Sequence, residues 1–268
     1  MSIRVVNYGG GVNSTALLCE VVRRKLTVDV IVFADTGSER PQTYAYIDVM
    51  QAYLAAHGYP PLSIVRWIRV VGEEAGTFVP LHTWCERGKT VPSRAYGYSG
   101  CTDKWKQKPA DKFVREHPKV VAAHAHGELV ERWIGYDADE PKRAERMAEK
   151  NPGATLWTWH APLIEWGMGR DECLASIEAA GLPSPGKSAC WMCPSSTKAD
   201  IRDLAASHPE LLKRSLDMEA AAIAAGNLAA PGAVRRGLGG SLNWGDYVRT
   251  GLGVDPADLP CGCYDGAD

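Results

Sequence analysis

Hydrophobic residues in the first 160 positions gather in short runs, and segments with a helical period lie between these runs. The runs predict five β-strands, over residues 3–8, 28–34, 63–70, 129–135 and 155–159. The segments between them predict helices over residues 14–25, 41–57, 103–116 and 142–150. This alternation is typical of an α/β, Rossmann-like fold, in which a parallel twisted sheet carries helices on both faces. In such folds ligands bind beyond the carboxyl ends of the strands.

The pattern changes after residue 185. A loop with cysteines follows, then alanine-rich helices over residues 198–226, then a glycine-rich tail. We therefore predict two domains, an α/β domain over residues 1–185 and a C-terminal helical region over residues 186–268. Residues 71–100 have no clear period and contain several glycines and prolines, which predicts a long active-site loop or lid.

Composition narrows the function classes. The chain has 268 residues, of which 45% are hydrophobic and 23% charged, and this is enough for one large α/β domain and a smaller region. A net charge of −2 does not indicate nucleic-acid binding over the whole surface. No apolar run reaches the roughly 18 to 20 residues of a membrane helix, and no signal-peptide pattern follows Met1. We expect a cytoplasmic protein without a membrane partner.

The strongest candidate for ligand binding is the turn between the first strand and the first helix, residues 9–15, Gly-Gly-Gly-Val-Asn-Ser-Thr. Glycines reach positive φ and let backbone N–H groups approach an anion, while the following helix adds the positive end of its dipole. The Walker motif requires a lysine that is absent here, and Ser14 replaces the last glycine of the dinucleotide fingerprint. Residues alone leave two interpretations, another kind of phosphate cradle and an ordinary glycine-rich turn.

Residues 10–15 resemble the S-G-G-x-D-S loop of the PP-loop ATP pyrophosphatases and phosphoadenosine phosphosulfate (PAPS) reductases, members of the adenine nucleotide alpha-hydrolase-like superfamily. Gly9 stands where the family usually has serine, and Asn13 where it usually has aspartate, so Asn13 brings no charge to a magnesium ion. Four further segments resemble family motifs in the family's order, at residues 34–44, 101–109, 134–144 and 161–183. The resemblance covers about residues 3–195.

The resemblance implies a binding site for an adenine nucleotide, either ATP or a phosphosulfate such as PAPS or APS. The residues expected around its phosphates are Gly9, Gly10, Gly11, Asn13, Ser14 and Thr15. Asp35, Thr36 and Gly37, in the segment similar to the reductases' D-T-G motif, would complete the site. Asp35 would hold magnesium or the ribose side of the nucleotide.

Three cations are the expected catalytic groups beside the phosphates: Lys104, Lys108 and Arg143. They stand in segments that resemble family motifs, and both chemistries of the family build negative charge on a phosphate. Electrostatic stabilisation of such charge is usually the largest catalytic contribution. Each cation also fits a surface ion pair.

Eight cysteines are many for a cytoplasmic chain, in which clustered thiols more often bind metal or do redox work. Cys190 and Cys193 form a C-x-x-C, which by itself fits a redox pair, half a zinc site, half an iron–sulfur site, or coincidence. In the APS-type reductases that the chain resembles, such a pair and an earlier cysteine ligate a [4Fe–4S] cluster, which implies Cys101, Cys190 and Cys193 here. Zinc on the same thiolates is the alternative.

The end of the chain, Cys261-Gly262-Cys263, resembles the reductases' C-terminal E-C-G-x-H. In that family the cysteine attacks the sulfur of the phosphosulfate, so the resemblance implies Cys261 as a catalytic nucleophile. Equally, Cys263 or Cys261 would complete the metal site, with Cys85 as a further candidate for the fourth ligand.

The resemblance implies an enzyme of sulfur chemistry on an adenine nucleotide. The first interpretation is a PAPS-reductase-like enzyme that works with a thiol reductant. The alternative is ATP-dependent thiolation of a nucleobase, tRNA or DNA, which needs a sulfur donor and a nucleic-acid acceptor. A third interpretation, a non-catalytic nucleotide sensor, is favoured by Gly9 and Asn13.

Overall fold

The computed structural model describes residues 2–72, 74–92, 94–95, 98–149, 151–228, 236–239 and 242–260. The chain forms two compact units assembled from separate segments. The first unit contains Met1–Asp35, Glu39–Arg66 and Gln107–Ser188, and the second contains Thr36–Ser38, Trp67–Lys106 and Ala189–Asp268. The division into a nucleotide-binding domain and a C-terminal region at residue 185 stays a prediction about function.

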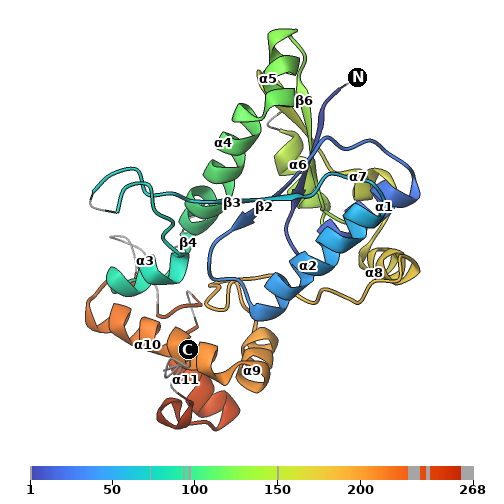
Figure 1. The fold of residues 1–268 in the computed structure, drawn as a ribbon. Coiled ribbons are helices and arrows are strands. Elements are labelled where there is room, and N and C mark those ends of the chain that lie inside the picture. Colours follow the sequence, from blue (N-terminus) through green and yellow to red (C-terminus); the bar gives the residue numbers. More distant parts are fainter. Residues whose placement is uncertain are drawn as a thin grey trace, which may run out of the picture. The chain divides into compact units, whose positions relative to one another are not determined.

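The first unit is built on a five-stranded sheet (Figure 1). Its strands are β1 (Arg4–Tyr8), β2 (Val30–Asp35), β3 (Leu62–Arg66), β6 (Val130–Ile134) and β7 (Trp157–His160). They lie in the order β3-β2-β1-β6-β7, and every neighbouring pair is parallel. The expected α/β fold with a parallel sheet is thereby confirmed, and the third strand is shorter than expected because it ends at Arg66.

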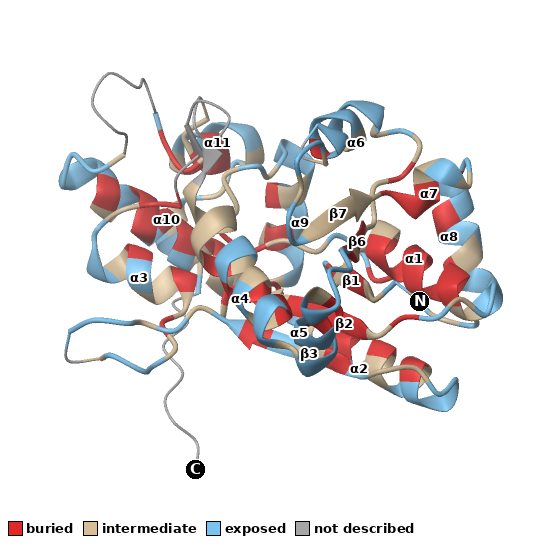
Figure 2. Cartoon of the chain, turned by 90° about the horizontal axis from the view of Figure 1, so that it is seen from above, coloured by how far each residue is buried: buried red, intermediate tan, exposed pale blue. Residues whose placement is uncertain are grey.

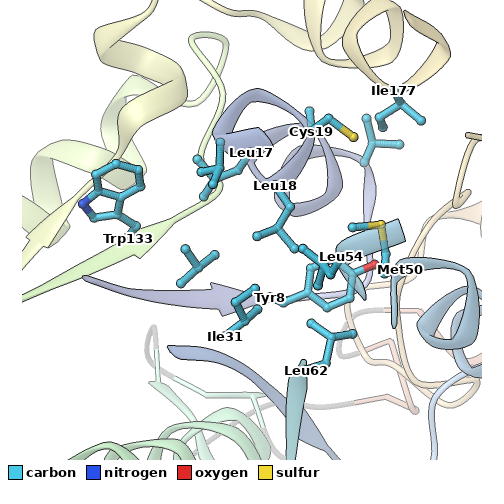
Figure 3. Packing of buried hydrophobic residues seen from close by; sticks show 14 of the residues in the cluster. Tyr8, Leu17, Leu18, Cys19, Ile31, Met50, Leu54, Leu62, Trp133 and Ile177 are labelled. Atoms are coloured by element: carbon cyan, nitrogen blue, oxygen red, sulfur yellow. The ribbon is translucent and has the colours of Figure 1, made fainter. Parts of the chain in front are cut away.

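Helices cover both faces of this sheet because successive strand residues point to opposite sides. Val6, Ile31 and Phe33 pack with one set of helices, and their neighbours Val5, Val30 and Val32 pack with another set. The first set is α1 (Val12–Arg23), α2 (Pro41–Ala56), α7 (Pro162–Glu165) and α8 (Arg170–Ala179). The second set is α4 (Lys108–Glu116) and α5 (Pro118–Ala125). Figure 3 shows the larger core, with Leu17 and Leu18 of α1 above Tyr8 and Ile31.

Strand order reverses between β1 and β6. The chain proceeds outward from β1 to β2 and β3, then returns to the other side of β1 as β6 and continues to β7. In open parallel sheets the crevice for ligands lies at such a reversal, beyond the carboxyl ends of the two strands. The segments that follow β1 and β6, beginning at Gly9 and Gly135, therefore meet at the position where a ligand is expected.

The second unit is helical. Its elements include α3 (Leu81–Arg87), α9 (Lys198–Ser207), α10 (Pro209–Ala224), α11 (Trp244–Tyr247) and the short pair β4 (Arg94–Ala95) and β5 (Tyr98–Ser99). Two π-helices, η1 (Thr102–Gln107) and η2 (Val248–Leu252), and the 3₁₀-helix η3 (Pro256–Asp258) complete its described elements. Its core contains Trp105, Trp191 and Trp244. Figure 2 shows buried stretches in α3 and α10 of this unit. The expected long loop at residues 71–100 contains α3, so it is not wholly irregular.

Two further helices expected from the sequence are present. The expected helix over residues 103–116 is present as η1 followed by α4, and the one over residues 142–150 as α6 (Pro141–Ala148). No described helix is long and apolar enough to cross a membrane.

Candidate functional site

The turn at the carboxyl end of β1 requires glycine at position 10. Gly10 has a φ of +74°, a conformation that residues with a Cβ rarely adopt. A Cβ at Gly10 would lie 3.0 Å from Cγ2 of Thr43 and 3.5 Å from the ring of Phe33. The backbone of the turn therefore lies closely against α2 and β2.

The start of α1 keeps donors for a ligand. Gly11 is the N-cap residue, it has an extended backbone, and it has no side chain to accept the first N–H groups of the helix. A Cβ at Gly11 would lie 2.7 Å from Oγ of Ser188, so the Ser188 hydroxyl lies directly over the turn. An uncapped helix start with a hydroxyl beside it is suited to bind an anion such as phosphate. No local pattern marks Ser188, because it lies far along the chain.

The two hydroxyls expected at the turn have different roles. Ser14 Oγ donates to the carbonyl oxygen of Gly11 at 3.1 Å, so it lies at the turn as expected. Thr15 is fully buried, and its Oγ1 lies 3.3 Å from the hydroxyl of Tyr8. The Thr15 hydroxyl is therefore part of the core, and its expected contact with the phosphates stays a prediction.

Gly135 connects the end of β6 to this turn. A Cβ at Gly135 would lie 2.8 Å from both the backbone nitrogen and Cα of Ser14. Contacts this short do not occur with a real side chain, so only glycine lets the chain after β6 pass the first turn of α1. The strand reversal and the glycine turn thus meet at one place in the first unit.

Asn13 belongs to a group of charged residues. Its amide donates to Oε2 of Glu140 at 3.3 Å, and its carbonyl oxygen accepts from Arg170 at 2.9 Å. Asp137 is almost fully buried beside it. Burial raises the pKa of Asp137, the charge of Glu140 adds to this, and a hydrogen bond from Asn13 opposes it. Carboxylates therefore lie next to the start of α1.

The three expected catalytic cations lie in different surroundings. Arg143 pairs with Glu140 and lies 4.3 Å from the ring centroid of Tyr136. Lys108 is exposed at the start of α4 in the first unit, whereas Lys104 belongs to the second unit. The catalytic roles of these three residues stay predictions.

Lys104 is enclosed by three tryptophans. Its Nζ lies 3.3 Å from the ring centroid of Trp84, 4.1 Å from that of Trp67 and 4.7 Å from that of Trp105. The three indoles also contact one another, with centroids 5.2 to 5.8 Å apart. The sequence does not predict this cation–π arrangement, because the three rings come from separate segments of the chain.

The three residues of the D-T-G segment belong to different units. Asp35 is buried, and its two oxygens accept from the Tyr44 hydroxyl and from Arg66 Nε, each at 2.8 Å. These contacts fix the Asp35 carboxylate within the first unit, and its expected role at magnesium or the ribose stays a prediction. Thr36 and Gly37 belong to the second unit, where Thr36 Oγ1 lies 3.2 Å from Sγ of Cys190. The expectation that these two residues hold the nucleotide stays untested, and their described contacts are with the cysteine segment.

The three expected metal ligands lie in the second unit and belong to one hydrophobic cluster. The backbone N–H of Cys193 donates to the carbonyl oxygen of Cys190 at 3.1 Å, which closes the C-x-x-C turn. Burial raises the pKa of Cys193, a hydrogen bond from the backbone of Ser195 opposes this, and the neighbouring Cys101 adds to the increase. Cys101 and Cys193 are therefore close enough to interact electrostatically.

A complete metal site is not formed by the described residues. Among them, no group of three His, Cys, Asp or Glu side chains is close enough to hold a metal ion. Cys85 is buried in α3, while Cys261 and Cys263 lie outside the described residues. The thiols nevertheless are the donors that an iron–sulfur cluster or a zinc ion takes, so the chemistry of the set fits while its ligand number is incomplete.

The chain was compared with known proteins in sequence and in structure. No protein-family model matches the chain. Over 152 residues it is 31% identical to the uncharacterized nin region protein ORF290 of Escherichia phage lambda, a match that covers 53% of this chain and 50% of that protein. The chain thus spans about half the length of this relative.

One solved structure with a related arrangement is the U34-tRNA thiolase NcsA from Methanococcus maripaludis with its [4Fe–4S] cluster. The superposition covers 81% of this chain and 72% of that chain, with a TM-score of 0.40 and 14% identity. A likeness of this degree assigns no activity, so we infer function from the geometry of each unit.

Proposed function

We propose that this protein binds the phosphates of ATP at the start of α1 and uses the activated nucleotide in sulfur transfer. The observation that carries the proposal is the turn at residues 9–11. It combines a positive φ at Gly10, an uncapped helix start at Gly11 and the hydroxyl of Ser188 over the same backbone. Its place at the reversal of strand order, where Gly135 meets Ser14, supports a ligand site independently.

The charges beside the turn favour ATP over a phosphosulfate. Asn13 is hydrogen-bonded to Glu140, and Asp137 is buried next to both. Arg143 compensates part of the charge by pairing with Glu140, but the carboxylates that remain disfavour a bare anion, whereas a triphosphate chelated by magnesium brings further positive charge. The magnesium would arrive with the nucleotide, and Asn13 would contact it or the phosphates without adding a charge.

The second unit supplies the sulfur chemistry in this proposal. Cys101, Cys190 and Cys193 would ligate a [4Fe–4S] cluster, or zinc in its place, with the fourth ligand from Cys261, Cys263 or Cys85. When bound, such a cluster would hold the sulfur for transfer. Cys190 is buried and Cys193 is partly buried, which limits the access of water to these thiols.

The reaction class is adenylation followed by replacement with sulfur. An oxygen of the acceptor attacks the α-phosphate of ATP, and pyrophosphate leaves. Sulfur from the donor then displaces AMP, so the acceptor exchanges that oxygen for sulfur. The N–H groups at the start of α1 would stabilise charge on the phosphates during the first step. A nucleobase, in tRNA or DNA, is the acceptor class that this chemistry fits.

Product analysis tests the proposal. The purified protein is incubated with magnesium and ATP, a sulfur donor and unmodified tRNA or DNA, and in parallel with PAPS and a thiol reductant. We expect pyrophosphate release from ATP that requires magnesium, and no sulfite from PAPS. Sulfite release would instead establish the reductase. Tight ATP binding without pyrophosphate would establish a nucleotide sensor.

A further inference from the structure

The turn Thr36–Gly37–Ser38 is hydrogen-bonded to the C-x-x-C segment of the second unit. The carbonyl oxygen of Thr36 accepts from the backbone N–H of Leu81 at 2.9 Å, and that of Ser38 accepts from Trp191 at 3.0 Å. One bond joins the turn to α3, and the other joins it to the residue that follows Cys190. The turn is therefore tied on both sides by backbone hydrogen bonds.

Side chains add to this fixation. Ser38 Oγ accepts from the backbone N–H of His82 at 3.0 Å and lies 2.9 Å from its Nδ1. The His82 ring lies 5.7 Å from that of Trp191. Gly37 has a φ of +68°, and a Cβ there would lie 2.7 Å from the Phe78 ring. Thr36 and Ser38 are both 1% exposed, so solvent does not compete for their hydroxyls.

The hydrogen bonds around Thr36 Oγ1 define its direction toward Cys190. This oxygen accepts the backbone N–H of Ser38 at 3.2 Å and lies 3.2 Å from Sγ of Cys190. A hydroxyl has one proton, and a thiolate can only accept. When Cys190 is a thiolate, Thr36 is therefore the donor, and the N–H of Ser38 strengthens that donation by polarising the hydroxyl.

From these contacts we propose that Thr36 is a positioning residue for the Cys190 thiolate, because its hydrogen bond to the sulfur restricts the directions in which that thiolate can bind a soft metal. The inference rests on the sulfur half of the proposed function and is independent of nucleotide binding. Hydrogen-bond partners of metal ligands fix ligand orientation, and their loss typically weakens metal binding by 10- to 100-fold.

Cadmium binding to the full chain tests the role of Thr36. Cd²⁺ alone is the probe, because its thiolate charge-transfer absorption reports direct sulfur ligation without any turnover. We expect Thr36→Val, which keeps the shape and removes the hydroxyl, to weaken Cd²⁺ binding at least about 10-fold. Thr36→Ser should bind Cd²⁺ nearly as tightly as the wild type. Cys190→Ser should show weaker thiolate charge-transfer absorption than the wild type when Cd²⁺ is bound.

Thr90→Val is the matched control, because the Thr90 hydroxyl is exposed in the same unit and donates to the carbonyl oxygen of Asn227. It should leave Cd²⁺ affinity unchanged. If Thr36→Val does not fold, Thr36→Ala against Thr36→Ser gives the same comparison. Equal Cd²⁺ affinity of the folded variant with and without the hydroxyl would overturn the proposal, as would a wild-type protein whose Cd²⁺ absorption does not depend on Cys190.

ATP binding measured on the same samples separates this proposal from the proposed function. Absence of ATP binding in the wild type would contradict the proposed function and leave the comparison of Cd²⁺ affinities intact. Equal Cd²⁺ affinity with and without the Thr36 hydroxyl, in a protein that binds ATP, would overturn the role of Thr36 alone.

Discussion

Two threonines around the glycine turn differ in whether their hydroxyls have a hydrogen-bond partner. Thr15 and Thr43 are both fully buried in the first unit, but their hydroxyls differ. Thr15 Oγ1 has the hydroxyl of Tyr8 as its partner, whereas Thr43 Oγ1, next to Gly10, has no hydrogen-bond partner in the structure as described. A buried polar group without a partner costs stability, and a paired one contributes.

The two threonines therefore predict opposite effects of the same substitution. Thr43→Val should raise the free energy of unfolding by about 1 kcal/mol, because it removes an unsatisfied hydroxyl without changing the volume. Thr15→Val should lower it by about 1 kcal/mol, because the Tyr8 hydroxyl loses its partner. Urea unfolding of both variants measures the difference. A Thr43→Val variant that is less stable than the wild type would show that this hydroxyl is satisfied.

Gly135 yields a prediction about both stability and binding. Gly135→Ala places a Cβ within 2.8 Å of the backbone of Ser14, so the first turn of α1 must shift. We expect a loss of roughly 1–3 kcal/mol in unfolding free energy, as for overpacking, and weaker ATP binding. Urea unfolding and calorimetric titration measure the two effects. If Gly135→Ala is destabilised but binds ATP with wild-type affinity, the segment that follows β6 is not part of the ATP site.

Helix α1 is fastened to α8 by a buried carboxylate. Glu20 of α1 is 2% exposed, accepts from Ser176 of α8 at 2.7 Å, and is paired with Arg23 and Arg24. Burial opposes its ionisation, but the hydrogen bonds from Arg23, Arg24 and Ser176 outweigh burial and lower the pKa of Glu20 to about 2. The helix that starts at the glycine turn is thus held in place by a charged group.

This carboxylate predicts an acid-dependent loss of stability. The unfolded chain has the ordinary pKa of 4.5, so the contribution is fully present above pH 4.5 and is lost as the pH falls toward 2. We expect it to reach about 2 kcal/mol, since solvent screens the more exposed Arg23. Glu20→Gln should be less stable at pH 7 and should lose this part of the pH dependence in urea unfolding. An unchanged pH profile in Glu20→Gln would contradict the prediction.

The helices and strands could be predicted from the sequence, whereas contacts between distant segments could not. Strand periodicity and the glycine turn predict the parallel sheet and the start of α1, because both depend on local patterns. The contacts of Lys104 could not be predicted, because Trp67, Trp84 and Trp105 meet only after folding. The contact between Thr36 and Cys190 is a similar case, because the two residues are 154 positions apart in the chain.

At the scale of the whole molecule, the residues proposed for nucleotide binding and those proposed for sulfur chemistry belong to different units. The phosphate turn belongs to the first unit, and Cys101, Cys190 and Cys193 belong to the second. This separation could not be deduced from the boundary at residue 185, because Trp67–Lys106 joins the second unit from the middle of the chain. Each unit has its own core, so the thiols should not be needed for nucleotide binding.

Cysteine variants test this separation. Cys193→Ser should keep wild-type ATP affinity, because no residue of the phosphate turn belongs to its unit, but it should abolish sulfur transfer to the acceptor. Calorimetry measures the affinity, and mass spectrometry of the acceptor measures the transfer. Sulfur transfer at the wild-type rate in Cys193→Ser would remove this thiol from the mechanism.

The central claim is that the turn at Gly10 binds nucleotide phosphates, and calorimetric titration with magnesium and ATP tests it most directly. Gly10→Ala and Gly58→Ala are a matched pair, because both glycines have a φ of +74° while a Cβ at Gly58 would meet no atom within 4 Å. Both variants should be destabilised by about 1 kcal/mol or more through the backbone. The account predicts that Gly58→Ala binds ATP like the wild type and that Gly10→Ala loses at least about 10-fold in affinity, close to 1.4 kcal/mol. Equal ATP affinity in the two variants would contradict it.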